Sequence, residues 1–229
     1  MSKKLSFKML RTLSPGKSLG VALGVAALVH RGGATPVTVQ EMGVGPNEVV
    51  QMTSSTLGTA WVYAGIIDLQ VDGQTTDGFC IDPFHWSIPG VQNYNTETLG
   101  DGPKSPGGPM GAATALKIEQ LWGEYYSHTM SSQNAAGLQI AIWELVGGTN
   151  FQLDSSDDYG ASAMLDWVSE NPNAAAANLT AVTGPGQDYA IPNVIPNAIP
   201  TAPDTGTTIT LFGMGLGGLA MLRRKLSRV

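Results

Sequence analysis

A long run of β-branched and aromatic residues in the first half of the chain predicts a β-hairpin. The run covers residues 61–71 and is followed by Asp72-Gly73, a dipeptide preferred in tight two-residue turns. The chain then returns through residues 74–82, a second stretch that contains β-forming residues. Short apolar stretches at 179–182 and 188–191 predict two further strands that complete the sheet.

Between these strands, apolar residues recur at the three-to-four-residue spacing of helices. The expected helices cover residues 111–126, 133–146 and 159–169. Ser132 is a suitable N-cap for the second helix, and Gly147-Gly148 would end it. The stretch 93–109 is rich in Gly and Pro and is expected to form a loop. The fold class is therefore predicted to be α+β, an antiparallel β-sheet or hairpin with a helical insertion.

The hydrophobic pattern changes at both ends of the chain. A basic segment, an apolar run at 19–29 and small residues at 32–34 are typical of a cleaved secretory signal peptide. A retained N-terminal anchor is the alternative. Near the other end, an apolar, Gly-rich run at 209–222 is followed by Arg223-Arg224-Lys225. This pattern predicts a short transmembrane helix with its basic tail in the cytoplasm.

Proline recurs at every fourth position in the segment 191–202, which precedes the C-terminal region. Such spacing excludes a helix or a central strand there and favours an extended stalk. The sequence therefore predicts four parts: a signal peptide (1–34), a globular domain (35–190), a stalk (191–202) and a sorting region (203–229).

The region between the two ends is strongly acidic. All 18 Asp and Glu residues lie between residues 35 and 222, with only two of the 12 Lys and Arg residues, Lys104 and Lys117, so its formal charge is −16. Such a charge repels phosphate backbones, and we expect no nucleic-acid partner. The three His residues and one Cys lack metal-ligand spacing, and no phosphate loop is present, so no metal or cofactor is expected.

A short motif precedes the C-terminal apolar run: Ala202, Pro203, Asp204, Thr205 and Gly206. It resembles the PEP-CTERM class of bacterial sorting signals, in the variant built on V-P-D-S-G, with Ala for Val and Thr for Ser. The resemblance implies an exosortase-type sorting peptidase as a partner. It also implies a location in the cell envelope or at the cell surface, anchored by the C-terminal helix or released into an extracellular matrix after processing.

Cys80 is the only cysteine of the chain, which is unusual for an exported protein, where disulfides are the common fate of cysteines. It lies in the sequence Phe79-Cys80-Ile81-Asp82. Gln139 follows 59 positions later, within the apolar stretch Leu138-Gln139-Ile140-Ala141-Ile142-Trp143. A long amide among large apolar side chains is a candidate for burial, and a buried amide must find hydrogen-bond partners or react.

These two segments together resemble the thioester domains of bacterial surface adhesins, a group that includes the TQXA domain. In that family a Cys between an aromatic and an aliphatic residue bonds to a Gln in an apolar stretch that commonly runs into Ala-Ile-Trp. The resemblance covers about residues 45–190 and implies a thioester between Cys80 and Gln139, with Asp82, His85 and Trp143 as candidate supporting residues. It implies a non-enzymatic protein that captures an amine-bearing surface or matrix molecule covalently, in adhesion or cross-linking. The described family members carry an L-P-x-T-G wall signal, so host-tissue adhesion is not carried over.

Other interpretations of the same residues stay open. Cys80 and His85 could form a Cys–His hydrolase, although a five-residue separation along one strand and turn disfavours hydrogen-bond contact. Cys80 could be an inert core thiol, His85 a polar residue that satisfies loop backbone groups, and Asp82 the first residue of an Asx turn before Pro83. The chain would then be a non-covalent structural or matrix protein of the envelope, in which the bond is absent or only a staple.

Overall fold

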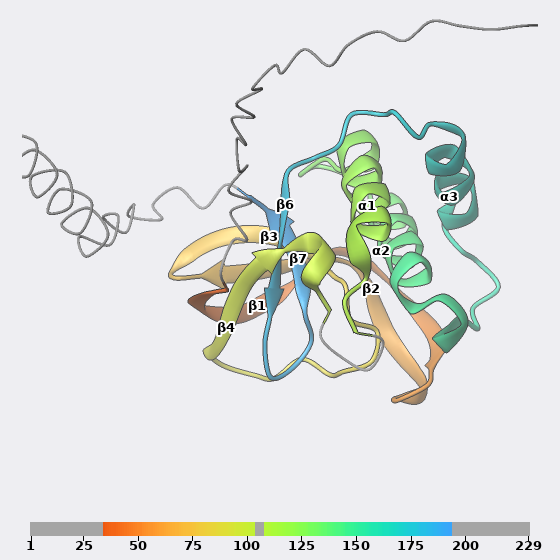
Figure 1. The fold of residues 1–229 in the computed structure, drawn as a ribbon. Helices are drawn as coiled ribbons and strands as arrows, with labels where there is room; N and C mark the ends of the chain where they lie inside the picture. The colour runs from red at the N-terminus through yellow and green to blue at the C-terminus, as the bar shows by residue number, and fades with distance from the viewer. Residues whose placement is uncertain (1–33, 104–107, 194–229) are drawn as a thin grey trace, which may run out of the picture. The chain divides into compact units, whose positions relative to one another are not determined.

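The computed structural model describes residues 34–103 and 108–193, and within these ranges the chain folds into an antiparallel sheet and three α-helices (Figure 1). The predicted α+β class with a helical insertion is confirmed. The expected signal peptide, sorting region and C-terminal transmembrane helix lie outside the described residues. No helix in the described part of the chain is long and apolar enough to cross a membrane.

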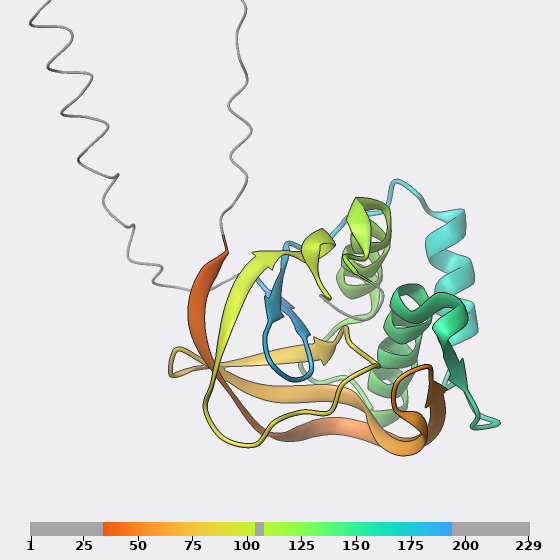
Figure 2. The ribbon, with the colours of Figure 1, turned by 60° about the horizontal axis from the view of Figure 1, so that its bottom comes forward.

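The strands close into a ring. They are β1 (Thr35–Ser54), β2 (Gly58–Val71), β3 (Gln74–Cys80), β4 (Gln92–Thr98), β5 (Phe151–Leu153), β6 (Leu179–Thr183) and β7 (Tyr189–Pro192). Their order in the sheet is β2-β3-β7-β6-β4-β1-β5, and β1 also pairs with β2, so six strands form a closed antiparallel barrel with β5 attached to β1 (Figure 2). Closure removes the exposed edges through which sheets associate.

The strand β1 holds this ring together, although the sequence pattern predicts no element there. Its first residues, 35–39, pair with β4, and residues 39–54 pair with β2. Two irregularities bend it, one between Glu41 and Gly43 and one between Val44 and Asn47. At the second, a Cβ on Gly65 of β2 would lie 2.2 Å from the carbonyl oxygen of Pro46, so the two strands approach too closely for any side chain. Two glycines and two prolines within β1 interrupt the alternation by which strands are recognised.

The predicted hairpin is confirmed as β2 and β3. Asp72 and Gly73 have φ values of 48° and 79°, both positive, as a type I′ turn requires. The turn is tied to β1 because Asp72 Oδ1 accepts a hydrogen bond from the Thr38 backbone N–H at 2.7 Å.

The prediction of a loop over residues 93–109 is wrong for the first part of that segment, which forms β4. This strand is mostly polar, with Tyr94 as its buried residue. It forms because β1 pairs with it on one side and β6 on the other. Tertiary hydrogen bonding overrides a composition that by itself favours a loop.

The helices α1 (Gly111–Tyr125), α2 (Ser132–Gly147) and α3 (Ala161–Glu170) lie to one side of the barrel (Figure 1). They match the three predicted helices, with small differences at the ends. The N-cap of α2 is Ser131 rather than the expected Ser132, and its Oγ accepts from the Asn134 backbone N–H at 3.2 Å. The third helix begins after Tyr159 and Gly160, because both residues have left-handed backbone conformations.

Helix α2 is the centre of the domain. It packs against β1 and β2 on one side and against α1 and α3 on the other. Every residue from Ala135 to Trp143 is buried, as in a helix enclosed on all sides. Gln139 therefore lies in the interior of the domain by its position on the helix.

The sheet extends slightly beyond the expected end of the globular domain. Thr180 of β6 pairs with Ile191, and Leu179 pairs with Pro192. The first two residues of the expected stalk thus belong to β7, with the proline at the end of the strand, where its missing N–H is tolerated. Residues 194–202 of the expected stalk lie outside the described residues.

Candidate functional site

Cys80 and Gln139 are in direct contact in the interior of the domain. The backbone N–H of Cys80 donates to Gln139 Oε1 at 2.9 Å, and Gln139 Nε2 donates to the Cys80 carbonyl oxygen at 2.8 Å. Cys80 is 1% exposed and Gln139 is 0% exposed. The structure therefore brings together the two residues that the sequence singled out, across 59 positions of chain.

The end of β3 explains this contact. Gly78 is the last residue of β3 that pairs with β2, whereas Cys80 pairs only with Tyr189 of β7, on the other side. The amide of Gln139 bonds both backbone groups of Cys80, where β3 is no longer paired with β2. These buried groups would otherwise lack partners, so the amide is fully satisfied where it lies.

Trp143 is one helical turn beyond Gln139, so both side chains extend from the same face of α2. Trp143 is buried, and its Nε1–H has no acceptor in good hydrogen-bond geometry among the described residues. It nevertheless lies near enough to Cys80 Sγ to lower the pKa of the thiol, as a poorly aligned donor would. Buried donors are rarely left unpaired, and the group within reach of this N–H is the Cys80 sulfur.

The thiol itself is held in its protonated form. Burial, and secondly the charge of Asp82, raise the pKa of Cys80 well above its usual value. The Asp82 backbone N–H, which donates to Sγ at 3.2 Å, and Trp143 act in the opposite direction but do not compensate. A cysteine that is permanently ionised needs surroundings that lower its pKa, such as nearby positive charge and contact with solvent.

Asp82 and His85 organise the loop that follows β3. Asp82 Oδ1 accepts from the Phe84 backbone N–H at 3.0 Å, which is the Asx turn expected from Asp82-Pro83. Asp82 Oδ2 lies 2.7 Å from His85 Nδ1, so the imidazole is engaged by the carboxyl group. Burial raises the pKa of Asp82 even though His85 and the Phe84 N–H favour its charged form. The pair fixes the loop that carries Trp86.

A cavity of about 240 Å³ lies beside Cys80, and we call it the Cys80 cavity. Cys80, Trp143 and His85 are part of its lining. Its other lining residues include three exposed aromatic side chains and a carboxylate: Trp61 (65% exposed), Tyr63 (60%), Trp86 (55%) and Glu41. Cys80 has almost no exposed surface, but it lines a hollow whose other lining residues include exposed aromatic side chains.

These additional residues were not predicted from the sequence. Trp61 and Tyr63 stand two positions apart on β2 and so share a face of the sheet, which is a signal that the pattern contained. Glu41 lies at the bulge of β1, and its Oε2 accepts a hydrogen bond from the Tyr189 hydroxyl at 3.3 Å. Burial, followed by the neighbouring Tyr94 and the charge of Glu41, raises the pKa of Tyr189, so this hydroxyl stays protonated as a donor.

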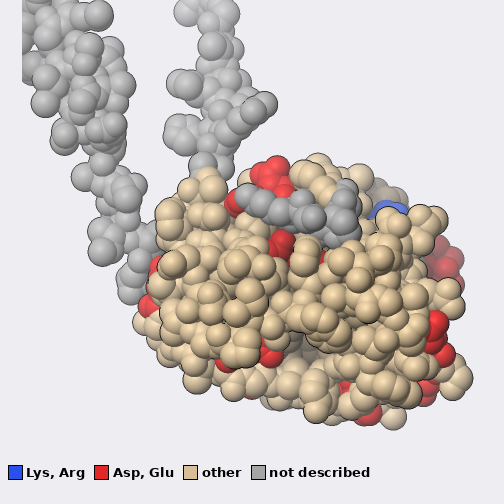
Figure 3. Space-filling view, turned by 90° about the horizontal axis from the view of Figure 1, so that it is seen from below, with Lys and Arg blue, Asp and Glu red and all other residues tan. Residues whose placement is uncertain are grey.

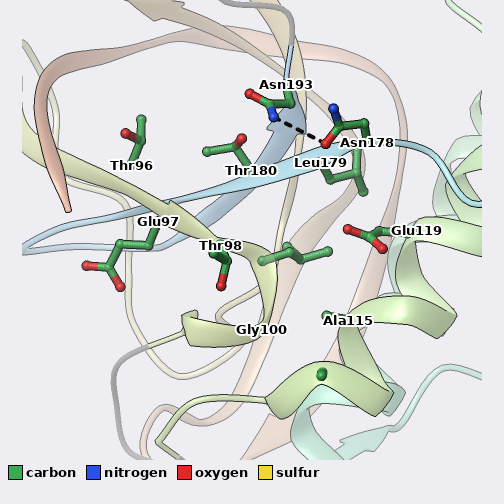
Figure 4. A pocket seen from close by; sticks show the side chains of 12 residues that line it. Thr96, Glu97, Thr98, Gly100, Ala115, Glu119, Asn178, Leu179, Thr180 and Asn193 are labelled. Carbon is green, nitrogen blue, oxygen red and sulfur yellow. Dashed lines mark hydrogen bonds between the residues drawn. The ribbon is translucent and has the colours of Figure 1, made fainter. Parts of the chain in front are cut away.

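A second and larger hollow, of about 510 Å³, lies between β4, β6 and α1, and we call it the polar hollow (Figure 4). Its lining includes Thr96, Glu97, Glu119 and Asn178. Asn193 Nδ2 donates to Asn178 Oδ1 at 3.2 Å, and burial raises the pKa of Glu119. None of its described lining residues is a Cys or a His, so we take the smaller cavity as the candidate site.

The surface of the domain carries the acidic excess predicted from the sequence. In Figure 3, Asp and Glu are spread over the face that is drawn, and blue is confined to one margin. Within the described ranges, no group of three or more His, Cys, Asp or Glu residues could hold a metal ion.

Comparisons with known proteins identify the C-terminal end of the chain. Residues 203–226 match a family model described as the VPDSG-CTERM motif. No curated protein and no solved structure matches the chain, and no match covers the globular domain, so the likeness to thioester domains stays a prediction. The matched motif is consistent with processing by an exosortase-type enzyme, with membrane association and with sorting to the cell surface. The chain thus carries at its C-terminus a PEP-CTERM-like sorting signal of the VPDSG type.

Proposed function

We propose that this protein is exported to the cell surface and that Cys80 and Gln139 form an internal thioester, which captures amine-bearing surface or matrix molecules covalently. The observation that carries the proposal is the pair of hydrogen bonds between the Cys80 backbone and the Gln139 amide, inside a solvent-excluded interior. The sorting signal supports the location at the cell surface. A covalent link would be useful there because it resists dissociation under shear.

When the thioester forms, the sulfur of Cys80 replaces the amide nitrogen on Cδ of Gln139. The sulfur of Cys80 adds to Cδ, the C–S bond forms, the C–N bond breaks, and nitrogen leaves as ammonia with the thiol proton. The Cys80 N–H on Oε1 supports this step because it stabilises the negative charge that develops on that oxygen. The fold supplies proximity, and burial excludes competing water. The 2.8 Å bond from Nε2 is given up on closure, whereas the 2.9 Å bond to Oε1 can persist.

Capture reverses the role of the sulfur. A primary amine attacks Cδ of Gln139, the new C–N bond forms, and the C–S bond breaks. The amine loses a proton and the sulfur regains one, which leaves an isopeptide link and a free Cys80 thiol. The unpaired Nε1–H of Trp143 beside the sulfur supports this step, since a nearby donor stabilises a departing thiolate.

A second function is favoured by the same contact. The Gln139 amide already satisfies the buried end of β3, so it has a structural purpose even if no bond forms. In that case the protein is a non-covalent structural or matrix protein of the envelope.

Intact-mass measurement of the full-length protein separates these two functions. The wild type should be lighter than its sequence requires by one molecule of ammonia, and Cys80→Ala should show the full expected mass. Gln120→Ala is a matched control, because Gln120 is also a buried helical glutamine but bonds the carbonyls of Pro172 and Ala174. It should keep the ammonia loss. Methylamine should then add to the wild type but not to Cys80→Ala. A wild type of full mass rules out the thioester and leaves the structural function.

A further inference from the structure

Three of the residues that line the Cys80 cavity are aromatic and largely exposed. Trp61 and Tyr63 lie on one face of β2, and Trp86 comes from the loop after Cys80; each is more than half exposed. Val49, the partner of Tyr63 across the β1–β2 ladder, is also exposed. Exposed tryptophan and tyrosine side chains gathered around a hollow are typical of a recognition surface.

The charge of the cavity selects for a cation. Among the described residues, the lining includes one acidic side chain, Glu41, and no Lys or Arg. The Tyr189 hydroxyl holds the Glu41 carboxylate in place, and Tyr189 stands directly opposite Cys80 in the β3–β7 ladder. Aromatic faces attract organic cations, and most strongly where water is partly excluded. One carboxylate and three rings thus line the cavity that Cys80 also lines.

We propose that the Cys80 cavity is a binding site for a primary ammonium group at the end of an unbranched aliphatic chain. Glu41 receives the charge, and the rings of Trp61, Tyr63 and Trp86 receive the charge and the alkyl chain. A volume of about 240 Å³ suits such a slender group and lies below the usual range for larger organic ligands. The role of this site in supplying the amine to the thioester rests on the proposed function. The binding of a cation there can be tested by itself.

The bound cation must lose a proton before it can react. The ammonium gives one proton to the Glu41 carboxylate, and the free amine attacks Cδ of Gln139. The C–N bond forms, the C–S bond breaks, and the second amine proton passes to the sulfur. Glu41 then releases its proton to solvent. The balance is one thioester and one ammonium ion converted into one amide, one thiol and one proton.

The reaction is tested with two nucleophiles on full-length protein. Cadaverine is a cation at neutral pH, whereas hydroxylamine is uncharged, so the ratio of their rates measures recognition of charge. Glu41→Gln keeps an acceptor for Tyr189 but removes the charge, and should lower this ratio roughly tenfold. Trp61→Ala and Trp86→Ala alter exposed side chains and should lower it in the same direction. Glu124→Gln removes an equal charge from an exposed position on α1 and should leave the ratio within about twofold of wild type.

Binding without reaction is tested in Cys80→Ala, which cannot form the thioester. Cadaverine should change the tryptophan fluorescence of this variant in a saturable way, and the added Glu41→Gln change should abolish that response. If the wild type shows no ammonia loss but this response is present, the proposed function fails and the cation site stands. If the thioester forms but Glu41→Gln leaves the rate ratio unchanged, or Glu124→Gln lowers it equally, the cation site is overturned. Absence of a saturable response in Cys80→Ala also overturns it.

Discussion

The Cys80 cavity and the polar hollow are formed by the same barrel and its helices, but their linings differ in chemistry. The polar hollow has about twice the volume, and its side chains include hydroxyl, amide and carboxyl groups, two of which, Asn178 and Asn193, bond each other. The Cys80 cavity has a buried thiol, an unpaired indole N–H and exposed aromatic rings. Volume alone would therefore select the polar hollow, whose described lining contains neither a Cys nor a His. Groups with unused bonding capacity beside a nucleophile are the better guide to a reactive site.

The largest effect that separates the two regions concerns Gln139. In a Cys80→Ala background, where no thioester can form, Gln139→Ala leaves a buried backbone N–H and C=O without partners. We expect the free energy of unfolding to fall by roughly 2–5 kcal/mol, measured by denaturant titration. In the polar hollow, Asn193→Ala removes one exposed hydrogen bond and should cost less than about 1 kcal/mol. Equal costs would show that the Gln139 contact is no more structural than a surface bond.

An intermediate effect is expected from the pH dependence of stability near Cys80. Burial raises the pKa of Asp82 above 3.8, so at pH values between the two pKa values the folded state binds more protons than the unfolded state. The contribution of Asp82 to the free energy of unfolding therefore rises as pH falls through its folded pKa, and becomes constant below 3.8. Asp82→Asn should remove this part of the dependence in denaturant titrations at several pH values.

Asp158 supplies a control of opposite sign for that measurement. Hydrogen bonds from Ser162 and from backbone groups lower the pKa of Asp158, so its contribution to stability is present above the ordinary pKa and is lost as pH falls. Asp158→Asn should therefore change the slope of the free energy of unfolding against pH in the direction opposite to Asp82→Asn. A slope that is unaffected by Asp82→Asn would contradict the raised pKa of Asp82.

The smallest effect is expected in the polar hollow. Burial raises the pKa of Glu119, but the side chain is partly open to solvent, which screens its charge. Glu119→Gln should change the free energy of unfolding by no more than about 0.5 kcal/mol and should leave the ammonia loss intact. A loss of the mass difference in this variant would mean that the two regions are coupled and that the comparison between them does not hold.

Local features of the sequence determined much of this protein. Asp72-Gly73 predicts its own turn, helical spacing predicts α1, α2 and α3, and the segment at 203–206 predicts a sorting signal that the family match bears out. Cys80 and Gln139 could be selected in advance because a lone cysteine and an amide among large apolar side chains are each unusual in their settings. The resemblance to thioester domains added Asp82, His85 and Trp143 as candidate supporting residues. Each of these signals depends on residues that are close together in the chain.

The tertiary structure alone decided the closure of the barrel and the surroundings of the sulfur. The strands β1 and β4 are held by hydrogen bonds to distant partners, and a ladder satisfies any backbone whatever its side chains. Glu41 and Tyr189 come from separate strands and meet near Cys80 because pairing register sets which residues face one another. Register is a property of the assembled sheet, so no local pattern contained it.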